Sequence, residues 1–203
     1  LIVIVGSVFS VISTAFYIIN SYRSVRYKQT ESNITSKPSD VTIIVPVYNE
    51  ETEFFNNVLS AVESQGTKVI VVGDGCSYPY SEIAAKHSFT FLTTLVRGGK
   101  RKALSLAMHY VDTPYVMFVD SDTLLPADSV ADLLSSFTSE VGGVGANLRI
   151  VEDGRALSYA AEFVERSREV ILKAMNHNGH VMILDGGAAI YRTELVKPFI
   201  LSK

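Results

Sequence analysis

The chain has 203 residues, which is enough for one sizeable α/β domain but not comfortably for two. Its net charge of −3 and pI near 5.8 argue against a nucleic-acid-binding protein, because such proteins usually carry a basic face. The single cysteine, Cys76, allows no internal disulfide, has no zinc-ligand spacing with the histidines, and fits a reducing, cytosolic setting for the folded part.

The first 19 residues contain no charged side chain and are dominated by Ile, Val and Phe. A helix of this length would span roughly 29 Å, close to the thickness of a bilayer, so we expect a transmembrane helix over residues 1–20. The stretch lacks the basic front end and cleavage site of a secretory signal. Arg23, Arg26 and Lys28 follow it, which predicts that the next domain faces the cytosol. A buried core helix is the alternative interpretation.

A polar linker is expected over residues 21–40, followed by a domain over residues 41–203 in which strand and helix patterns alternate. The strands are expected at residues 41–45, 68–72, 89–93, 115–119 and 144–150, and the helices at residues 51–63, 80–86, 100–110, 127–137 and 156–175. Pro126 stands at the expected start of one helix. The charged face of the last helix is expected to be solvated or ion-paired. The alternation predicts an α/β, Rossmann-like domain with a mostly parallel sheet.

An acidic triplet, Asp120-Ser121-Asp122, directly follows the apolar run at residues 115–119. A buried strand that ends in two carboxylates delivers them to the edge of the sheet where open α/β folds bind ligands. Two carboxylates this close repel each other unless a cation lies between them, and hard oxygen ligands suit a divalent ion that also holds substrate phosphates. A polar turn with an Asp cap on the next helix is the alternative.

Two other strand ends carry unusual polar residues, and in a parallel sheet all three ends lie at the same edge. Pro46, Tyr48 and Glu50 follow the first strand; Tyr48 can stack on a base, and Glu50 can accept hydrogen bonds from ribose hydroxyls or a base edge. A plain turn with acids at a helix start is the alternative. Asp74 follows the second strand between two glycines, on a loop that a ligand can approach closely.

A cluster of cations at residues 97–102, Arg-Gly-Gly-Lys-Arg-Lys, stands at the expected start of a helix. Cations there oppose the helix dipole unless they meet an anion, and exposed N–H groups beside Lys and Arg suit a phosphate. A merely solubilising basic turn is the alternative. A base-stacking Tyr, acids for ribose, cations for a diphosphate and a metal-binding pair together describe a nucleoside-diphosphate site.

Four strings in the chain resemble those of family 2 inverting glycosyltransferases: residues 45–50 (VPVYNE), 72–77 (VGDGCS), 98–101 (GGKR) and 120–123 (DSDT). The similarity is strongest to the processive, membrane-embedded branch that includes hyaluronan, chitin-oligosaccharide and cellulose synthases. It spans residues 41–192 in order. The resemblance implies a GT-A nucleotide-sugar-binding domain preceded by one transmembrane helix.

The resemblance implies that a UDP-sugar is bound by a set of matching residues: Pro46, Tyr48, Glu50, Asp74, Lys100, Arg101 and Asp120. The first four would contact the uracil and ribose, and the two cations would contact the phosphates. Asp122 would be the main ligand of Mg²⁺ or Mn²⁺ on the diphosphate, with Asp120 as its partner. Asp185, Gly186 and Gly187 stand where related enzymes have an acceptor-site segment, and a tight turn before a strand is the alternative.

Two departures from the family pattern matter. The usual Asp-Asp pair of the second loop is Gly73-Asp74 here, and the retained Asp matches the base-contacting position. The family's catalytic base lies in a later acidic motif that precedes Gln-x-x-Arg-Trp, and this chain contains no Trp. We therefore expect a fragment that holds no catalytic residue, with the base downstream of Lys203.

The expected function is transfer of a sugar from a UDP-sugar to a growing glycan with inversion, by a membrane-bound enzyme of the polysaccharide synthase type on the cytosolic face. Its partners would be the donor, a glycan or lipid-linked acceptor, and the membrane. A single-transfer enzyme with a lipid-phosphate acceptor and a non-catalytic sugar-nucleotide-binding module are the alternatives. A phosphotransferase of the haloacid-dehalogenase type is disfavoured, because Leu124 stands where that class has a Thr.

Overall fold

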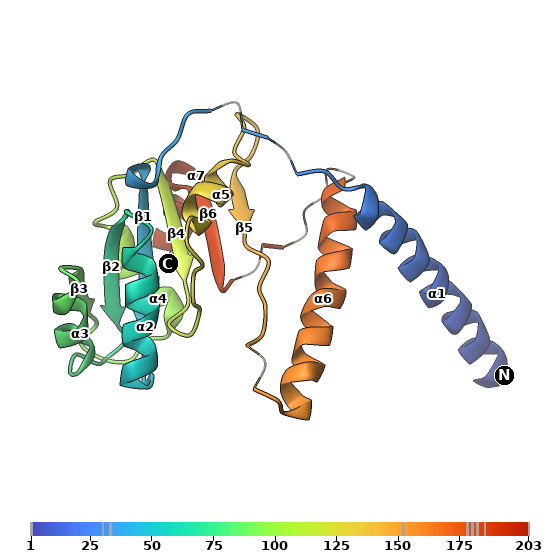
Figure 1. Ribbon diagram of the computed structural model, residues 1–203, viewed down its shortest axis with the longest axis horizontal. Coiled ribbons are helices and arrows are strands. Elements are labelled where there is room, and N and C mark those ends of the chain that lie inside the picture. Colours follow the sequence, from blue (N-terminus) through green and yellow to red (C-terminus); the bar gives the residue numbers. More distant parts are fainter. Residues whose placement is uncertain are drawn as a thin grey trace. The chain divides into compact units, whose positions relative to one another are not determined.

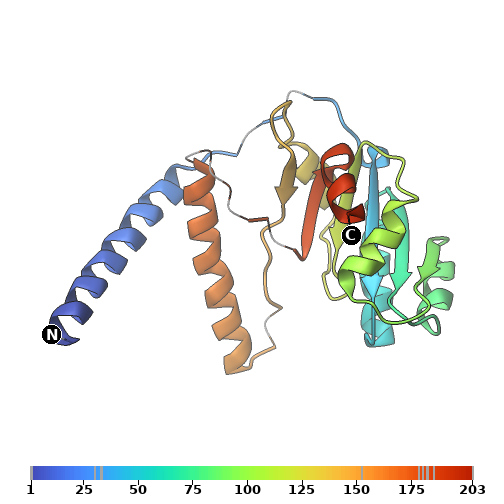
Figure 2. The same cartoon turned by 180° about the vertical axis from the view of Figure 1, so that it is seen from behind.

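The computed structural model describes residues 2–202 apart from residues 30, 33, 152, 178, 180, 182 and 185. The chain divides into two compact units. The helical unit contains residues 1–29 and 147–184, and the sheet unit contains residues 30–146 and 185–203. Figures 1 and 2 show the elements of both units from opposite sides.

The sheet unit is built, within its described residues, on a six-stranded sheet in the order β3-β2-β1-β4-β6-β5. The strands are β1 (Val41–Val47), β2 (Lys68–Gly73), β3 (Thr90–Thr93), β4 (Tyr115–Val119), β5 (Gly143–Gly145) and β6 (Ala188–Arg192). The first four are parallel, whereas β6 is antiparallel to both β4 and β5. All residues of β1 and β4 are buried, as expected for central strands. The predicted α/β fold with a mostly parallel sheet is confirmed.

Helices cover both faces of this sheet. On one face, α4 (Lys100–Met108) packs its apolar side against Ile44, Val116 and Phe118, and α7 (Thr193–Leu201) adds partly buried side chains to the same cluster. Alternate residues of a strand point to opposite faces, so the buried Ile43 lies on the face opposite Ile44. Figure 1 shows α2 (Thr52–Glu63) in front of the sheet, whereas α4 and α7 are in front in Figure 2. The remaining short helices are α3 (Tyr80–Lys86), α5 (Ser129–Leu134) and η1 (Pro38–Asp40).

Two predicted elements are shorter than expected. The helix expected at residues 127–137 is α5, which begins at Ser129, because Asp128 has a φ of 61° in the left-handed region and cannot continue a right-handed helix. The strand expected at residues 144–150 is β5, which ends at Gly145. Its partner β6 begins at Ala188, and the last ladder bond runs from the Ala146 N–H to that carbonyl at 2.9 Å. Beyond this point no described strand pairs with the segment that follows β5.

No helix was predicted at the position of α7. Its interior contains Pro198, which lacks an N–H and normally disfavours the middle of a helix. The helix forms because its apolar side, which includes Val196 and Ile200, packs against the cluster between the sheet and α4. Tertiary burial therefore outweighs the local preference of the sequence.

The helical unit contains α1 (Ile2–Arg26) and α6 (Ala156–His177), which contact each other. The segment Ile4–Arg26 is long and apolar enough to cross a membrane, and among the described side chains of α1 Asn20 alone is buried. The helix continues beyond residue 20, where we expected it to end. The predicted division into residues 1–20, 21–40 and 41–203 stays a prediction.

The charged face of α6 is ion-paired, as predicted. Arg166 Nε lies 2.7 Å from Glu162 Oε1, and Lys173 Nζ lies 2.6 Å from Glu169 Oε1. Arg149, from the segment before the helix, contacts Glu169 at 2.6 Å. A hydrogen bond from the Ile150 N–H, together with Arg166, lowers the pKa of Glu162. The contacts of Arg149 and Ile150 hold this segment against α6, and the other pairs lie within the helix.

Candidate functional site

The carboxyl ends of β1, β2 and β4 meet at one edge of the sheet, because these three strands are adjacent and parallel. The Asp74 N–H donates to the Val47 carbonyl at 2.9 Å and joins the loops after β2 and β1. Ser121 Oγ donates to Glu50 Oε1 at 2.9 Å and joins the loops after β4 and β1. The three predicted loops therefore form one site. We call it the carboxyl edge, made of residues 48–51, 74–77, 94–100 and 120–123.

Tyr48 and Glu50 lie in the loop after β1, whereas Pro46 is buried within the strand. The Tyr48 side chain is 42% exposed, and the Arg97 guanidinium lies over its ring with Cζ 3.9 Å from the centroid. The Tyr80 hydroxyl donates to the Glu50 carbonyl at 2.8 Å and fixes the loop backbone. Burial raises the pKa of Tyr80, so this hydroxyl stays protonated and continues to donate.

Asp74 is only 5% exposed, and both of its carboxylate oxygens accept hydrogen bonds. Oδ1 accepts from the Gly98 N–H at 2.7 Å, and Oδ2 accepts from the Gly99 N–H at 2.8 Å. The Thr94 hydroxyl lies 3.4 Å from Oδ1. Asp74 therefore fixes the backbone just before α4. This backbone belongs to the segment at residues 97–102, where the sequence predicted phosphate binding. Its predicted contact with a base stays a prediction.

The glycines on either side of Asp74 are required by close contacts. Gly75 has a φ of +72°, and a Cβ there would lie 2.4 Å from the Arg97 backbone nitrogen. A Cβ at Gly73 would lie 1.9 Å from the Cys76 carbonyl oxygen. A side chain at this position would therefore require the loop to shift. Burial also raises the pKa of the Cys76 thiol, so the thiol is not an activated nucleophile.

The loop after β4 meets both the cation cluster and the predicted acceptor segment. Lys100 Nζ forms an ion pair with Asp120 Oδ1 and lies 3.4 Å from the Gly186 carbonyl oxygen. The Asp120 N–H donates to the Gly187 carbonyl at 3.0 Å. Gly186 and Gly187 thus lie at the carboxyl edge beside Lys100. Asp185, the other predicted acceptor residue, is outside the described residues.

Asp122 is exposed, and its carboxylate has no hydrogen-bond or ion-pair partner in the described part of the chain. No group of three or more His, Cys, Asp or Glu among the described residues could hold a metal by itself. Carboxylate oxygens suit Mg²⁺ and Mn²⁺, and Mg²⁺ is usually bound through one or two carboxylates together with substrate phosphates. Asp120 and Asp122 therefore fit a cation that shares its ligands with a diphosphate, and not a closed protein-only site.

Arg101 is directed to α7 rather than to the carboxyl edge. Its Nη2 donates to the Ser202 carbonyl at 3.2 Å, and its guanidinium lies 5.5 Å from the centroid of the Phe199 ring. The sequence could not show this contact because α7 was not expected. The predicted phosphate contact of Arg101 stays a prediction, and Lys100 is the cation that the fold brings to the acidic pair.

Two residues at the carboxyl edge had no assigned role in the sequence analysis. Ser121, the middle residue of the acidic triplet, connects the first and third loops through Glu50. Arg97, the first cation of the cluster, covers Tyr48. The motifs contained both residues, but spacing along the chain says nothing about which loop each side chain meets.

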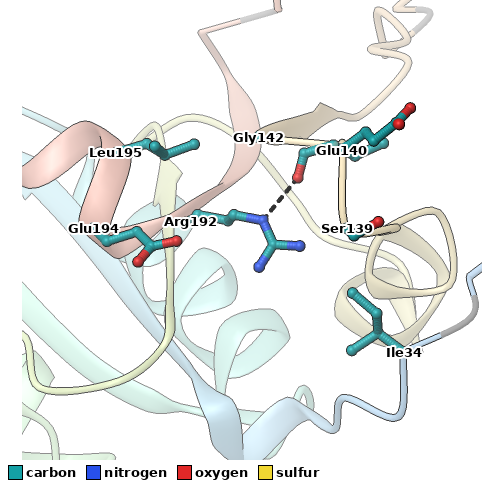
Figure 3. Close-up of a pocket in the computed structure, with 8 residues that line it drawn as sticks. Ile34, Ser139, Glu140, Gly142, Arg192, Glu194 and Leu195 are labelled. Atoms are coloured by element: carbon teal, nitrogen blue, oxygen red, sulfur yellow. Dashed lines mark hydrogen bonds between the residues drawn. The ribbon is translucent and has the colours of Figure 1, made fainter.

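Two hollows lie at the opposite edge of the sheet, which we call the amino edge. One has a volume of about 370 Å³ and is lined by residues that include Ile34, Glu140 and Arg192. Figure 3 shows the Arg192 side chain extending toward the segment at residues 139–142, where its Nε donates to the Val141 carbonyl at 3.0 Å. The other hollow, of about 640 Å³, is lined in part by Lys68 and Asp112, which form an ion pair at 2.7 Å. These hollows do not coincide with the predicted site.

The family model described as Glycosyl transferase family 2 matches residues 42–199. The N-acetylglucosaminyltransferase of Azorhizobium caulinodans is 26% identical over 222 aligned positions, which cover 97% of this chain and 55% of the relative. The hyaluronan synthase of Streptococcus pyogenes is 28% identical over 186 positions, which cover 80% of this chain and 43% of the relative. The chain therefore spans about half the length of the curated relatives it matches.

Solved structures show the same fold. A mannosyltransferase from Pyrobaculum calidifontis, in complex with GDP-Man and Mn²⁺, has a TM-score of 0.74 at 20% identity, over 98% of this chain and 58% of that chain. The glucosyl-3-phosphoglycerate synthase of Mycobacterium tuberculosis, in complex with UDP, has a TM-score of 0.52 at 17% identity, over 82% of this chain and 66% of that chain. At these identities the likeness establishes the fold alone, which is the predicted GT-A fold.

Proposed function

Because the chain belongs to glycosyl transferase family 2 and is related to polysaccharide synthases, we propose that it binds a UDP-sugar with a divalent cation and supplies the donor half of a glycosyltransferase site. The observation that carries this proposal is the junction of Lys100, Asp120 and the Gly186 carbonyl at the carboxyl edge. A cation, a carboxylate and the predicted acceptor segment meet there within the reach of one small ligand.

In this proposal, three residues of the carboxyl edge bind the nucleoside. The partly exposed Tyr48 ring stacks on the uracil, since every base has a π-face that an aromatic ring can cover. Glu50 and Asp120 accept hydrogen bonds from ribose hydroxyls, because ionised carboxylates are acceptors only. The hydrogen bond from Ser121 to Glu50 orients that carboxylate before the donor arrives.

In this proposal, the bound diphosphate replaces an ion pair that forms within the free protein. Lys100 exchanges its contact with Asp120 for phosphate oxygens, which leaves both carboxylates of the acidic triplet available. Asp122, exposed and without a partner in the described residues, holds a Mg²⁺ or Mn²⁺ ion with Asp120. When bound, such a cation neutralises the charge of the departing diphosphate. The solved mannosyltransferase that contains GDP-Man and Mn²⁺ supports this pairing of nucleotide and metal.

For the whole protein, we propose that an acceptor hydroxyl attacks the anomeric carbon from the side opposite UDP. The C–O bond to the diphosphate breaks as the new bond forms. The configuration at the anomeric carbon therefore inverts. The hydroxyl proton goes to a base that we expect downstream of Lys203. The position of Gly186 and Gly187 beside Lys100 supports an acceptor next to the donor sugar. The related hyaluronan synthase and N-acetylglucosaminyltransferase support a glycan as that acceptor.

The proposed enzyme is anchored in a membrane by α1, with the sheet unit in the cytosol. Most described side chains of α1 are apolar and nearly all are exposed, which suits a helix surrounded by lipid. Arg23 and Arg26 in its last turn, followed by Lys28, support a cytosolic location for that end.

A nucleotide-release screen tests the proposal. Full-length protein in detergent would be incubated with UDP-glucose, UDP-N-acetylglucosamine, UDP-glucuronate and GDP-mannose, each with Mg²⁺, with Mn²⁺ or with EDTA. We expect release of UDP from at least one UDP-sugar only when a metal is present. Calorimetric titration of the same sugar nucleotides measures binding in parallel, and metal-dependent binding without release would favour the non-catalytic module. Absence of binding for every UDP-sugar would contradict the proposal.

A further inference from the structure

The helix α7 runs back along α4 toward the carboxyl edge. It follows β6, which is antiparallel to β4 and therefore runs from the carboxyl edge to the amino edge. At the amino edge the Thr193 N–H donates to the Pro114 carbonyl at 2.9 Å, and Lys197 Nζ donates to the Val111 carbonyl at 2.8 Å. Because α7 begins beside the residues that follow α4, it ends beside the start of α4. Figure 2 shows the two helices next to each other.

Arg101 joins these two helix ends. It lies in the first turn of α4, and its Nη2 donates to the carbonyls of Ser202 and Phe199 at 3.2 and 3.4 Å. The guanidinium also lies over the Phe199 ring, with Cζ 5.5 Å from the centroid. Carbonyls at the end of a helix have no partner within it and carry partial negative charge, so a cation beside them is stabilising. Arg101, which opposes the dipole of α4, thus meets the negative end of α7.

This contact holds the end of α7 next to the proposed donor site. Lys100 directly precedes Arg101, and consecutive Cα atoms are about 3.8 Å apart. Lys100 Nζ forms an ion pair with Asp120 at the carboxyl edge, whereas Arg101 binds the backbone at Ser202. One turn of α4 therefore contacts both the acidic triplet and the chain that leaves α7. In the proposed function, the segment after Lys203 supplies the base, so Arg101 binds the backbone that leads into this segment.

We propose that Arg101 is a positioning residue for sugar transfer, which holds the end of α7 so that the following segment enters the site in a fixed position relative to the donor. The inference rests on the proposed function, because it requires a base downstream of Lys203. A base must lie within hydrogen-bond reach of the acceptor hydroxyl, and a displacement of about 1 Å can slow a reaction about 100-fold. In this role Arg101 acts through the backbone of α7, whereas Lys100 meets the phosphates.

Binding and turnover of the full-length protein in detergent with Mn²⁺ separate this role from a phosphate contact. In calorimetry, Arg101→Ala should keep the affinity for UDP within about twofold of the wild type. Its kcat, measured as UDP release from the sugar nucleotides of the release screen, should fall by about 10- to 100-fold. Lys86→Ala, which removes one positive charge from the exposed end of α3, is the matched control and should keep both values. A fall in UDP affinity that matches the fall in kcat would overturn the inference in favour of a phosphate contact.

A double-mutant cycle with Phe199 supplies the second test. Phe199→Ala removes the ring beneath the guanidinium, so it should lower kcat without changing the affinity for UDP. Leu195→Ala, which removes another exposed apolar side chain of α7, should change neither value. In the Phe199→Ala background, Arg101→Ala should lower kcat by a smaller factor than it does in the wild type. An undiminished effect in that background would contradict a role that acts through α7.

Hydrogen exchange gives a readout that does not depend on turnover. Arg101→Ala should speed the exchange of amides in the last turn of α7, while the amides of β1 and β4 keep their wild-type rates. Unchanged exchange in α7 would contradict the positioning role. A wild-type protein that binds no UDP-sugar would contradict the proposed function itself, and one that binds without release would contradict both the downstream base and this role. Wild-type release that Arg101→Ala leaves unchanged would contradict the role of Arg101 alone.

Discussion

The two edges of the sheet differ in how their charged groups are satisfied. At the amino edge, Lys68 is paired with Asp112, and the Arg192 guanidinium donates to the carbonyls of Val141 and Thr138 at 3.0 and 2.7 Å. At the carboxyl edge, Asp122 has no partner in the described part of the chain, and Arg97 rests on a ring rather than on an anion. Two hollows lie at the amino edge, whereas the residues of the proposed donor site lie at the carboxyl edge.

Concavity and polarity alone therefore do not identify a ligand-binding site. A charge that already has a partner would have to give up that partner to bind a ligand, which cancels much of the gain. A charged group that has no counter-ion in the free protein loses no such contact, so the free energy of its interaction with a ligand is not offset in this way. The ion pair that the carboxyl edge must exchange, Lys100 with Asp120, is accessible to solvent and costs little to open.

The largest expected effect is that of Asp122→Asn at the carboxyl edge. Asn keeps the size of the side chain but removes the charge that binds the cation, so we expect metal-dependent affinity for UDP to fall by more than about 100-fold. Affinity measured in EDTA should match that of the wild type. Thermal unfolding without nucleotide should also be unchanged, because this carboxylate is exposed. Wild-type UDP affinity in the presence of Mn²⁺ would disprove the metal assignment.

Lys100→Ala removes a cation from the carboxyl edge and tests its proposed contact with the diphosphate. Loss of a charge-assisted contact to the diphosphate should weaken UDP binding by about tenfold to 100-fold in calorimetry. Lys68→Ala is the matched variant at the amino edge, and it should leave UDP affinity unchanged because Lys68 faces Asp112. Equal effects of the two substitutions would remove the distinction between the edges.

Asp74→Asn should lower the stability of the fold. One oxygen that accepts from a glycine N–H is replaced by an NH₂ group that cannot accept, so we expect a loss of about 1.5–3 kcal/mol in the free energy of unfolding. In a chain of this size each kcal/mol lowers the melting temperature by roughly 2–4 °C. Calorimetry or circular dichroism measures the shift. Asp112→Asn, which breaks an exposed pair, should change stability far less, and a larger effect there would reverse the ranking.

The smallest effect concerns the pH dependence of the amino edge. The hydrogen bond and charge of Lys68 hold the pKa of the Asp112 carboxyl below its usual range. Because the folded-state pKa is depressed, this stabilisation is present above the unfolded pKa of about 4 and is lost as the pH falls through the folded pKa. The free energies of unfolding of the wild type and of Lys68→Ala, measured with urea from pH 7 to pH 3, should therefore converge as the pH falls. If the difference between the two free energies stayed constant over this pH range, the ion pair of Lys68 with Asp112 would not be its cause.

Sequence patterns were most informative where burial was continuous. The strand at residues 115–119 and the helix at residues 80–86 have the bounds that their patterns predicted, and the apolar runs identified β1 and β2 within two residues. Predictions failed where a distant segment decides the local structure. The length of β5 depends on β6, and α7 forms despite Pro198 because it packs against α4.

Sequence alone was sufficient for the fold class and for the family, because alternating strand and helix patterns and four short motifs are local properties of the chain. It also identified the loops of the site, since parallel strands put their carboxyl ends at one edge. Only the tertiary structure decided the partners within those loops: Arg97 lies on Tyr48, Asp74 holds the glycine loop, and Arg101 points to α7. Such contacts depend on the three-dimensional directions of side chains from different elements, and the order of residues along a chain does not specify these directions.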